Sequence, residues 1–189
     1  MDVVEFGRLS DAQRAELRAG EEDPFGAAGN PLQWRPKDRH VALRRADGRL
    51  VASAGLVLGD LQVEDRPPMQ FVGLGGVFVT AACRGQGLGK RIVEEALRRA
   101  GTMGPNVVLL FCHRSRTGFY EQHAFVEIDS PVLVQQSDGY AEMPLAAMWR
   151  ALSADAALPP GELPSTACRS ELRHQSRAAD DRRSRWTQT

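Results

Sequence analysis

The residues best suited to chemistry form a basic, glycine-rich segment near the middle of the chain. Arg84 to Lys90 reads RGQGLGK, with glycines at positions 85, 87 and 89. Glycines leave backbone N–H groups accessible, and the positive end of a helix macrodipole attracts anions. Cations flank the start of the helix predicted here, since Arg84 precedes it and Arg91 lies in its first turn. The segment therefore favours phosphate binding, and a purely structural glycine-rich turn is the alternative.

Spacing excludes two common phosphate-binding loops. A Walker A loop requires glycine where Arg84 stands and Ser or Thr where Arg91 stands. A dinucleotide fingerprint, G-x-G-x-x-G, fails because the third glycine, Gly89, comes one residue too early. A nucleotide-dependent kinase is also a poor fit, because no Ser or Thr that could bind Mg²⁺ follows Lys90.

A strand and a helix are predicted to hold this segment in place. Gly75 to Thr80 is small, apolar and β-branched, which suits a buried strand. The helix ends at Gly101, and its other face carries two predicted i,i+4 ion pairs, Glu94–Arg98 and Glu95–Arg99. Its apolar face consists of Leu88, Ile92, Val93, Ala96, Leu97 and Ala100.

Two motifs in this order resemble a known family. The pattern R-x-x-G-x-G between a strand and a helix is similar to the acyl-CoA pyrophosphate loop of the GNAT (Gcn5-related N-acetyltransferase) superfamily. Further on, Gly118 to Phe125 reads GFYEQHAF and resembles the family's Y-x-x-x-G-F motif, with Ala124 in place of the usual glycine. The resemblance covers roughly residues 3 to 152.

The resemblance implies an acetyl-CoA-dependent N-acyltransferase that moves the acetyl group directly to a primary amine. It implies an α+β, GNAT-like α/β/α fold with a mixed, mostly antiparallel central sheet flanked by helices. Tyr120 would be the general acid near the CoA sulfur, and a tyrosine packed on a helix face is the structural alternative. The residues implied for acetyl-CoA binding are Val77, Phe78 and Val79 along the pantetheine, and Arg84, Gly85, Gln86, Gly87, Leu88, Gly89 and Lys90 around the diphosphate.

The general base is the gap in this interpretation. Many family members place a Glu on the strand just before the VFV segment, but this chain has Gly75 and Gly76 there. A non-catalytic module that binds acyl-CoA therefore remains an alternative. His113 is the best-placed histidine, although a lone histidine is more often structural. Acids that could act through water are Glu21, Glu22, Asp23, Glu127 and Asp129. The first three could also form an acidic pocket for a polycationic acceptor, as in aminoglycoside acetyltransferases.

Composition bounds the partners and the compartment. The 189 residues carry 24 Lys plus Arg and 24 Asp plus Glu, so no overall basic field favours nucleic acid or a membrane surface. The three cysteines form no CxxC pair, which predicts reduced thiols, a cytoplasmic location and no metal. The start of the chain does not resemble a signal peptide. We expect a small-molecule or peptide amine as acceptor and allow for a homodimer.

The rest of the chain predicts one domain, residues 1–152, followed by a tail, 153–189. Strands are expected over 39–45, 49–58 and 69–80, with a polar connection over 59–68. The apolar run 106–112 predicts a strand that is covered on both faces. The expected helices are 10–19, closed by Gly20, and 116–123, and a last hairpin spans 131–143. The tail is rich in Ala, Pro, Ser and Arg without apolar periodicity, which is typical of a disordered segment.

Overall fold

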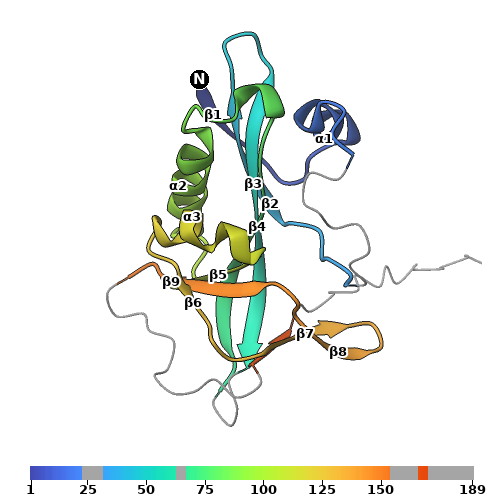
Figure 1. Ribbon diagram of the computed structural model, residues 1–189, viewed down its shortest axis with the longest axis vertical. Coiled ribbons are helices and arrows are strands. Elements are labelled where there is room, and N and C mark those ends of the chain that lie inside the picture. The colour runs from blue at the N-terminus through green and yellow to red at the C-terminus, as the bar shows by residue number, and fades with distance from the viewer. Residues whose placement is uncertain (23–31, 63–66, 154–165, 170–189) are drawn as a thin grey trace, which may run out of the picture.

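The computed structural model describes residues 1–22, 32–62, 67–153 and 166–169. Helix α1 (Asp11–Arg18) covers one face of a single sheet, and α2 (Leu88–Ala100) and α3 (Thr117–Glu121) cover the other (Figure 1). Two 3₁₀ turns, η1 (Ala81–Cys83) and η2 (Arg114–Arg116), precede α2 and α3. The strands are β1 (Asp2–Phe6), β2 (Arg39–Arg44), β3 (Leu50–Gln62), β4 (Met69–Val79), β5 (Val107–Cys112), β6 (Val126–Glu127), β7 (Val132–Gln136), β8 (Gly139–Glu142), β9 (Ala146–Ala151) and β10 (Thr166–Arg169).

The sheet is mixed and mostly antiparallel, which confirms the predicted fold class. Its strand order is β6-β9-β5-β4-β3-β10-β7-β8, with β2 also paired to β3 and β1 to β2. Among the strands of the described residues, two pairs are parallel, β4 with β5 and β10 with β7. The β4–α2–β5 unit is the crossover that the strand–helix–strand pattern predicts.

The main core lies between α2 and the sheet. Ile92 and Val93 on α2 are fully buried, as are Val72 on β4 and Val108 on β5. Burying one such side chain contributes roughly 1.5–3 kcal/mol of transfer free energy. Because this core holds α2 firmly against β4 and β5, the loop at the start of α2 has a fixed position relative to the strand ends.

A smaller core lies under α1 on the opposite face. Ser10 and Gln13 form a capping box at the start of α1, and Leu17 packs against Phe78 of β4. A cap of this kind stabilises a helix by about 1 kcal/mol. Ala19, with a φ of 49°, takes the left-handed cap position, one residue before the Gly20 that the sequence predicts as the end.

Strand β3 is longer than predicted. It continues through Gly59 to Gln62, where Gly59 pairs with Phe71 and Leu61 with Met69, so the expected connection over 59–68 is wrong for residues 59–62. Gly59 is needed inside the strand, because a Cβ there would lie 2.6 Å from the Phe71 ring. A glycine that leaves room for a neighbouring ring resembles a turn residue when only the sequence is read.

The predicted ion pairs on α2 are also replaced by others. Arg98 pairs with Glu95, three residues before it, and Arg99 reaches Glu5 of β1 with 2.9 Å between Nε and Oε2. Glu94 instead faces Lys90 at 3.9 Å. Because β1 packs beside α2, Arg99 pairs with Glu5 of β1 and not with Glu95 of its own helix.

Within the predicted tail, residues 166–169 form β10, which pairs with β3 and β7. The sequence pattern contains no signal for this strand. Residues 154–165 and 170–189 lie outside the described part of the chain.

Candidate functional site

Strands β4 and β5 separate in the middle of the sheet. They are paired only from Val72 to Leu74 on β4, opposite Val108 to Leu110 on β5, although β4 continues to Val79. Beyond Leu74, the pairing of β4 with β3 contains a bulge: Gly75 pairs with Gly55 and Phe78 with Ser53, so β4 has one residue more than β3 between these two pairs. Gly76, in the bulge, has a φ of +60°. Such a β-bulge bends the strand and strengthens its twist. Beyond Leu74, β4 keeps β3 on one side and has no pairing to β5 on the other.

The side chains of this open part of β4 alternate between the two faces. Val77 and Val79 pack on the core under α2, whereas Phe78 is buried on the α1 side. The backbone edge of Val77 to Val79 is therefore turned towards the gap between β4 and β5. This is the edge that the sequence interpretation assigns to the pantetheine, and a strand edge can pair with an extended amide chain.

The start of α2 has the character of an anion site. Gly87 is its N-cap with a φ of 75°, and no side chain caps the helix. Its first turn holds no acid, in contrast to α1, which has Asp11 and a capping box. The first N–H groups of a helix have no partner within the helix, and their dipoles favour an anion. Gly85 and Gly87 have positive φ and open space around them, so glycine is required there by backbone conformation.

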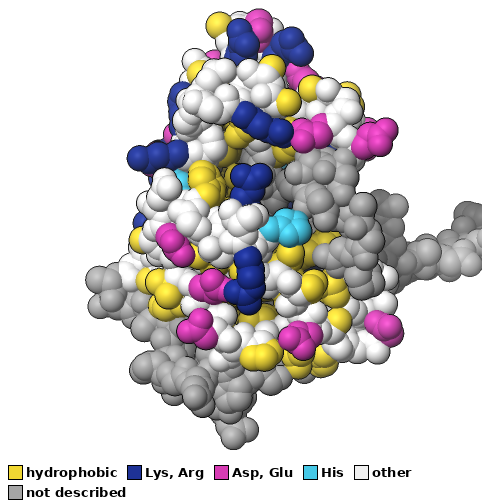
Figure 2. All heavy atoms as spheres, viewed as in Figure 1, with side chains coloured by type: hydrophobic (Ala, Val, Ile, Leu, Met, Phe, Trp, Pro, Cys, Tyr) yellow, Lys and Arg dark blue, Asp and Glu magenta, His cyan; other side chains and the backbone are white. Residues whose placement is uncertain are grey.

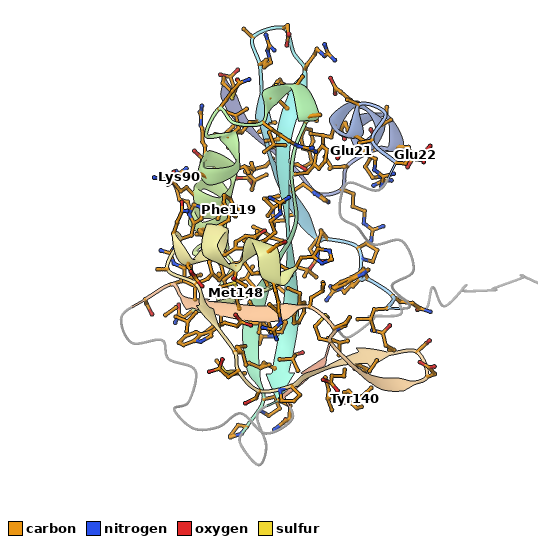
Figure 3. All side chains as sticks on the ribbon, viewed as in Figure 1. Glu21, Glu22, Lys90, Phe119, Tyr140 and Met148 are labelled. Carbon is orange, nitrogen blue, oxygen red and sulfur yellow. The ribbon has the colours of Figure 1, made fainter. Side chains whose placement is uncertain are left out.

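The other residues of the loop differ in the groups that they expose to a ligand. Gly89 lies in the first turn of α2, where an added Cβ would be 3.5 Å from the Phe119 ring of α3. Leu88 is buried in the core, and the Gln86 side chain donates to the Ala82 carbonyl. Lys90 is exposed and lies on the outer side of α2 (Figure 3). The loop thus presents mainly backbone groups, with Lys90 as a cation at its rim.

The Arg84 side chain bonds to protein groups, whereas the sequence interpretation assigns it to the diphosphate. Its Nε donates to the Val79 carbonyl at 3.1 Å, and its Nη2 bonds to the Glu21 carboxylate at 2.5 Å. The guanidinium carbon lies 5.7 Å from the centroid of the Phe78 ring. In this structure Arg84 joins β4 to the segment that follows α1, so a contact to a diphosphate would require it to leave Glu21.

Tyr120 lies on α3 beside the end of β5. Its ring centroid is 5.0 Å from that of Phe119 and 5.9 Å from that of Phe125, both edge-on. Burial, and then the charge of a Cys112 thiolate, raise the pKa of Tyr120 to about 12, against a smaller lowering by Arg116. The phenol is therefore protonated at neutral pH and is a proton donor.

None of the base candidates that the sequence suggests has a compelling position. Glu127 on β6 forms an ion pair with Arg114 at 2.8 Å. His113 comes directly before η2, and its side chain is exposed. Glu21 is paired with Arg84, and Glu22 points outward from α1 (Figure 3). Asp129 is exposed, and Asp23 lies outside the described residues.

Lys37, a residue that the sequence interpretation did not single out, fills the space that side chains at Gly55 and Gly75 would need. Gly55 of β3 and Gly75 of β4 are cross-strand partners. A Cβ on Gly55 would be 2.5 Å from Lys37 Cγ, and a Cβ on Gly75 would be 2.9 Å from Lys37 Nζ. Lys37 thus lies across both glycines. Lys37 reaches both glycines because the register of β3 and β4 pairs Gly55 with Gly75. The sequence around Lys37 does not predict that register.

The described residues hold neither a metal-binding cluster nor a membrane-spanning helix. No group of three or more His, Cys, Asp or Glu side chains there is arranged to hold a metal ion. None of the helices in that part of the chain has the length and apolarity needed to cross a membrane. Cys83 and Cys112 are free and buried.

Known proteins resemble this chain in sequence and in fold. The family model described as acetyltransferase (GNAT) family matches residues 7–125. Glucosamine 6-phosphate N-acetyltransferase 1 of Oryza sativa subsp. japonica is 40% identical over 91 residues, which are 46% of this chain and 52% of that protein. This chain therefore spans about half the length of the curated relative it matches.

Solved structures agree in fold at low sequence identity. A GNAT family N-acetyltransferase (YhbS) from Escherichia coli in complex with CoA has a TM-score of 0.57 at 15% identity, over 87% of this chain and 88% of that one. An acyl-CoA N-acyltransferase from Pseudomonas aeruginosa has a TM-score of 0.51 at 20% identity, over 79% and 99%. Since the family model covers more than half of the sequence and the structures share the fold, this chain belongs to the GNAT acetyltransferase family.

Proposed function

We propose that this protein transfers the acetyl group of acetyl-CoA to a primary amine by direct attack in a ternary complex. Two observations carry the proposal: the backbone edge of Val77 to Val79 has no pairing to β5, although the Val79 carbonyl accepts from Arg84, and the N-terminus of α2 has no side-chain cap. An extended pantetheine bonded to the strand edge can place its diphosphate at the helix N-terminus.

All steps of the transfer except deprotonation of the amine have a residue to serve them. Backbone N–H groups from Gln86 to Lys90 bind the diphosphate, and an N–H of the open β4 edge stabilises the negative charge that gathers on the thioester oxygen. The amine nitrogen forms a bond to the carbonyl carbon as the carbon–sulfur bond breaks. Tyr120 donates a hydrogen bond to the leaving thiolate. Because its raised pKa of about 12 makes the phenol a weaker acid than a thiol, the proton that the thiolate finally takes up comes from water. The amine proton leaves to water.

The acceptor class is a primary amine, small or peptidic. The name of the rice relative points to an amino sugar phosphate as one member of that class, and the matched region covers half of that protein. A cytoplasmic location, a homodimer and the lack of a metal requirement stay predictions.

A second function is favoured by one feature. Gly75 and Gly76 stand where many relatives place a carboxylate base, so a module that binds acyl-CoA without turnover is the alternative. Detection of the released thiol distinguishes the two. With acetyl-CoA and a panel of primary amines, we expect thiol release that depends on the amine. Saturable acetyl-CoA binding without thiol release for any amine would favour the binding module.

A further inference from the structure

One guanidinium group joins the donor edge of β4 to an acid on another element. The Arg84 Nε donates to the carbonyl oxygen of Val79, the last residue of β4, at 3.1 Å. Its Nη2 donates to Glu21 Oε2 at 2.5 Å. The Glu21 carboxylate therefore lies within the reach of a single guanidinium group from the strand edge proposed for the pantetheine.

The backbone places Glu21 there independently of Arg84. The N–H of Glu21 donates to the Arg18 carbonyl at 3.0 Å, directly after α1. Leu17 of that helix belongs to the same buried cluster as Phe78 of β4, so the end of α1 is fixed against the strand. A departure of Arg84 would therefore leave the carboxylate beside β4.

Both partners of this ion pair are open to solvent. The Arg84 side chain is 49% exposed and the Glu21 side chain is 32% exposed. Figure 2 shows a basic side chain directly beside an acidic one at the surface near α1, and Figure 3 labels Glu21 in that region. Once Arg84 has left, a small molecule can contact the carboxylate from solvent without any change in the core.

Donor binding would give Arg84 a stronger partner than Glu21. Arg84 comes three residues before Gly87, the N-cap of α2, so it belongs to the loop that would surround the diphosphate. A diphosphate carries more negative charge than one carboxylate, and a guanidinium group binds phosphate oxygens through two parallel hydrogen bonds. A pantetheine paired with β4 would also compete for the Val79 carbonyl. Both effects favour the departure of Arg84 from Glu21.

The departure of Arg84 would leave a negative charge uncompensated beside the donor. A primary amine is protonated at neutral pH, because an alkylammonium group has a pKa of about 10.4. An ammonium group and a carboxylate form a charge-assisted hydrogen bond, which is stronger than a neutral one. Glu21 can therefore replace one cation, Arg84, by another, the acceptor.

We propose that acetyl-CoA binding moves Arg84 from Glu21 to the diphosphate, and that the freed Glu21 carboxylate then binds the ammonium group of the acceptor. This inference rests on the proposed acetyl transfer and deepens it, because it names an acceptor-binding residue and an order of binding in which the donor comes first. Glu21 holds the protonated amine, which loses its proton to water before the nitrogen attacks. Donor and acceptor are then coupled, and such coupling is reciprocal: each raises the affinity for the other by the same factor.

Calorimetry with CoA measures this coupling without turnover, since CoA carries the diphosphate and the pantetheine but no acetyl group. CoA is titrated into the protein alone and with an excess of butylamine, 1,4-diaminobutane or glucosamine, at matched ionic strength. 1-Butanol is the neutral control for butylamine. For the wild type we expect at least one amine to tighten CoA binding by about 5- to 20-fold, and 1-butanol to leave it unchanged.

Two variants lose the coupling in opposite ways. In Glu21→Gln we expect CoA alone to bind more tightly and the amine to bind weakly whether or not CoA is present. In Arg84→Gln we expect CoA to bind more weakly, whereas the amine binds the free protein as tightly as it binds the CoA complex. A purely structural ion pair would not move the amine affinity in opposite directions.

Glu5→Gln is the matched control, because it breaks another Arg–Glu pair between distant elements, with 2.9 Å between Arg99 Nε and Glu5 Oε2. This variant should keep the coupling of the wild type, and melting temperatures check the folding of all variants. Equal coupling in the wild type and Glu21→Gln, or no coupling with any of the three amines, would overturn the inference and leave the acetyl transfer in place. A wild type that neither binds CoA nor releases thiol would overturn the acetyl transfer and this inference with it.

Discussion

At the scale of single residues, burial sets the protonation of the groups beside the end of β5. Burial, and then the charge of Glu127, raise the pKa of Cys112 to about 11, and the pKa of Tyr120 is raised to about 12. Both side chains are therefore neutral at physiological pH. Cys112 is unsuited to nucleophilic attack, since the thiolate is the reactive form, whereas the protonated Tyr120 can donate a hydrogen bond to a leaving thiolate.

Replacing Tyr120 separates its chemical role from its packing. In Tyr120→Phe the ring contacts with Phe119 and Phe125 are kept and only the hydroxyl is lost. We expect kcat to fall about 10- to 1000-fold, with acetyl-CoA affinity nearly unchanged, since the thiolate is formed only during the reaction. Steady-state kinetics and calorimetry measure the two quantities. Normal turnover in the variant would reduce Tyr120 to a packing residue.

His123 links the fold to pH. It is buried, its Nε2 has no hydrogen-bond partner, and burial lowers its pKa below the usual 6.5. The unfolded chain binds a proton at His123 near pH 6.5, whereas the folded chain resists it, so stability is full above that pH and falls as the pH drops below it. We expect the melting temperature to decline below about pH 6.5.

The variant His123→Gln should flatten this part of the pH profile. His40, whose pKa is also lowered, serves as a comparison, because His40→Gln should remove a separate share of the same decline. A profile that stays the same in His123→Gln would show that the histidine does not couple folding to protonation.

At the scale of elements, the two long helices begin in different ways because they do different things. Helix α1 is capped by its own side chains, whereas α2 begins at Gly87 with its N–H groups open and no acid in its first turn. An uncapped start costs stability, roughly 1 kcal/mol relative to a good cap. A diphosphate bound to these N–H groups would compensate for this loss of stability, because it accepts the hydrogen bonds that a cap would otherwise accept.

Aspartate at the start of α2 tests this account. Gly87→Asp is expected to weaken acetyl-CoA binding by at least about 100-fold, since a side chain and a negative charge enter the space for the diphosphate. Gly48→Asp is the matched control, because Gly48 has a φ of 87° and open space but lies in the β2–β3 turn. Both variants carry a similar backbone strain of roughly 1–2 kcal/mol. Equal acetyl-CoA affinity in the two variants would contradict the loop assignment.

The ion pair between Arg84 and Glu21 joins the loop before α2 to the segment after α1. Both side chains are partly exposed, so the pair contributes about 0–1 kcal/mol to stability. Glu21→Gln should therefore change the melting temperature little, yet it frees the Arg84 charge for an anion. We expect tighter acetyl-CoA binding in this variant, most clearly at low salt. If Arg84→Gln and Glu21→Gln both leave the affinity unchanged, Arg84 has no part in donor binding.

The elements were largely predictable and the contacts between them were not. The β4–α2–β5 unit follows from a buried apolar strand, a glycine loop and an amphipathic face, all of which are local patterns. The end of β3 was missed because Gly59 resembles a turn residue and in fact makes room for Phe71. Arg84 with Glu21, and Lys37 over Gly75, are joined across 63 and 38 residues of sequence, and only the register of the sheet brings each pair together.

At the scale of the whole molecule, the gap between β4 and β5 can be reached from two sides, which the sheet separates. Helices α2 and α3 cover one face, with the proposed donor loop at the start of α2, while α1 covers the other face (Figure 1). The gap between β4 and β5 opens where these approaches meet. We propose that donor and acceptor meet at this gap, as direct transfer requires.

Calorimetric titration of the purified protein with acetyl-CoA, with ATP and NAD as controls, tests the central claim most directly. The account predicts binding of acetyl-CoA in the micromolar range, about −8 kcal/mol, with much weaker binding of ATP and NAD, because only a pantetheine can pair with the open edge of β4. Absence of acetyl-CoA binding, or binding of ATP with equal affinity, would contradict the donor site.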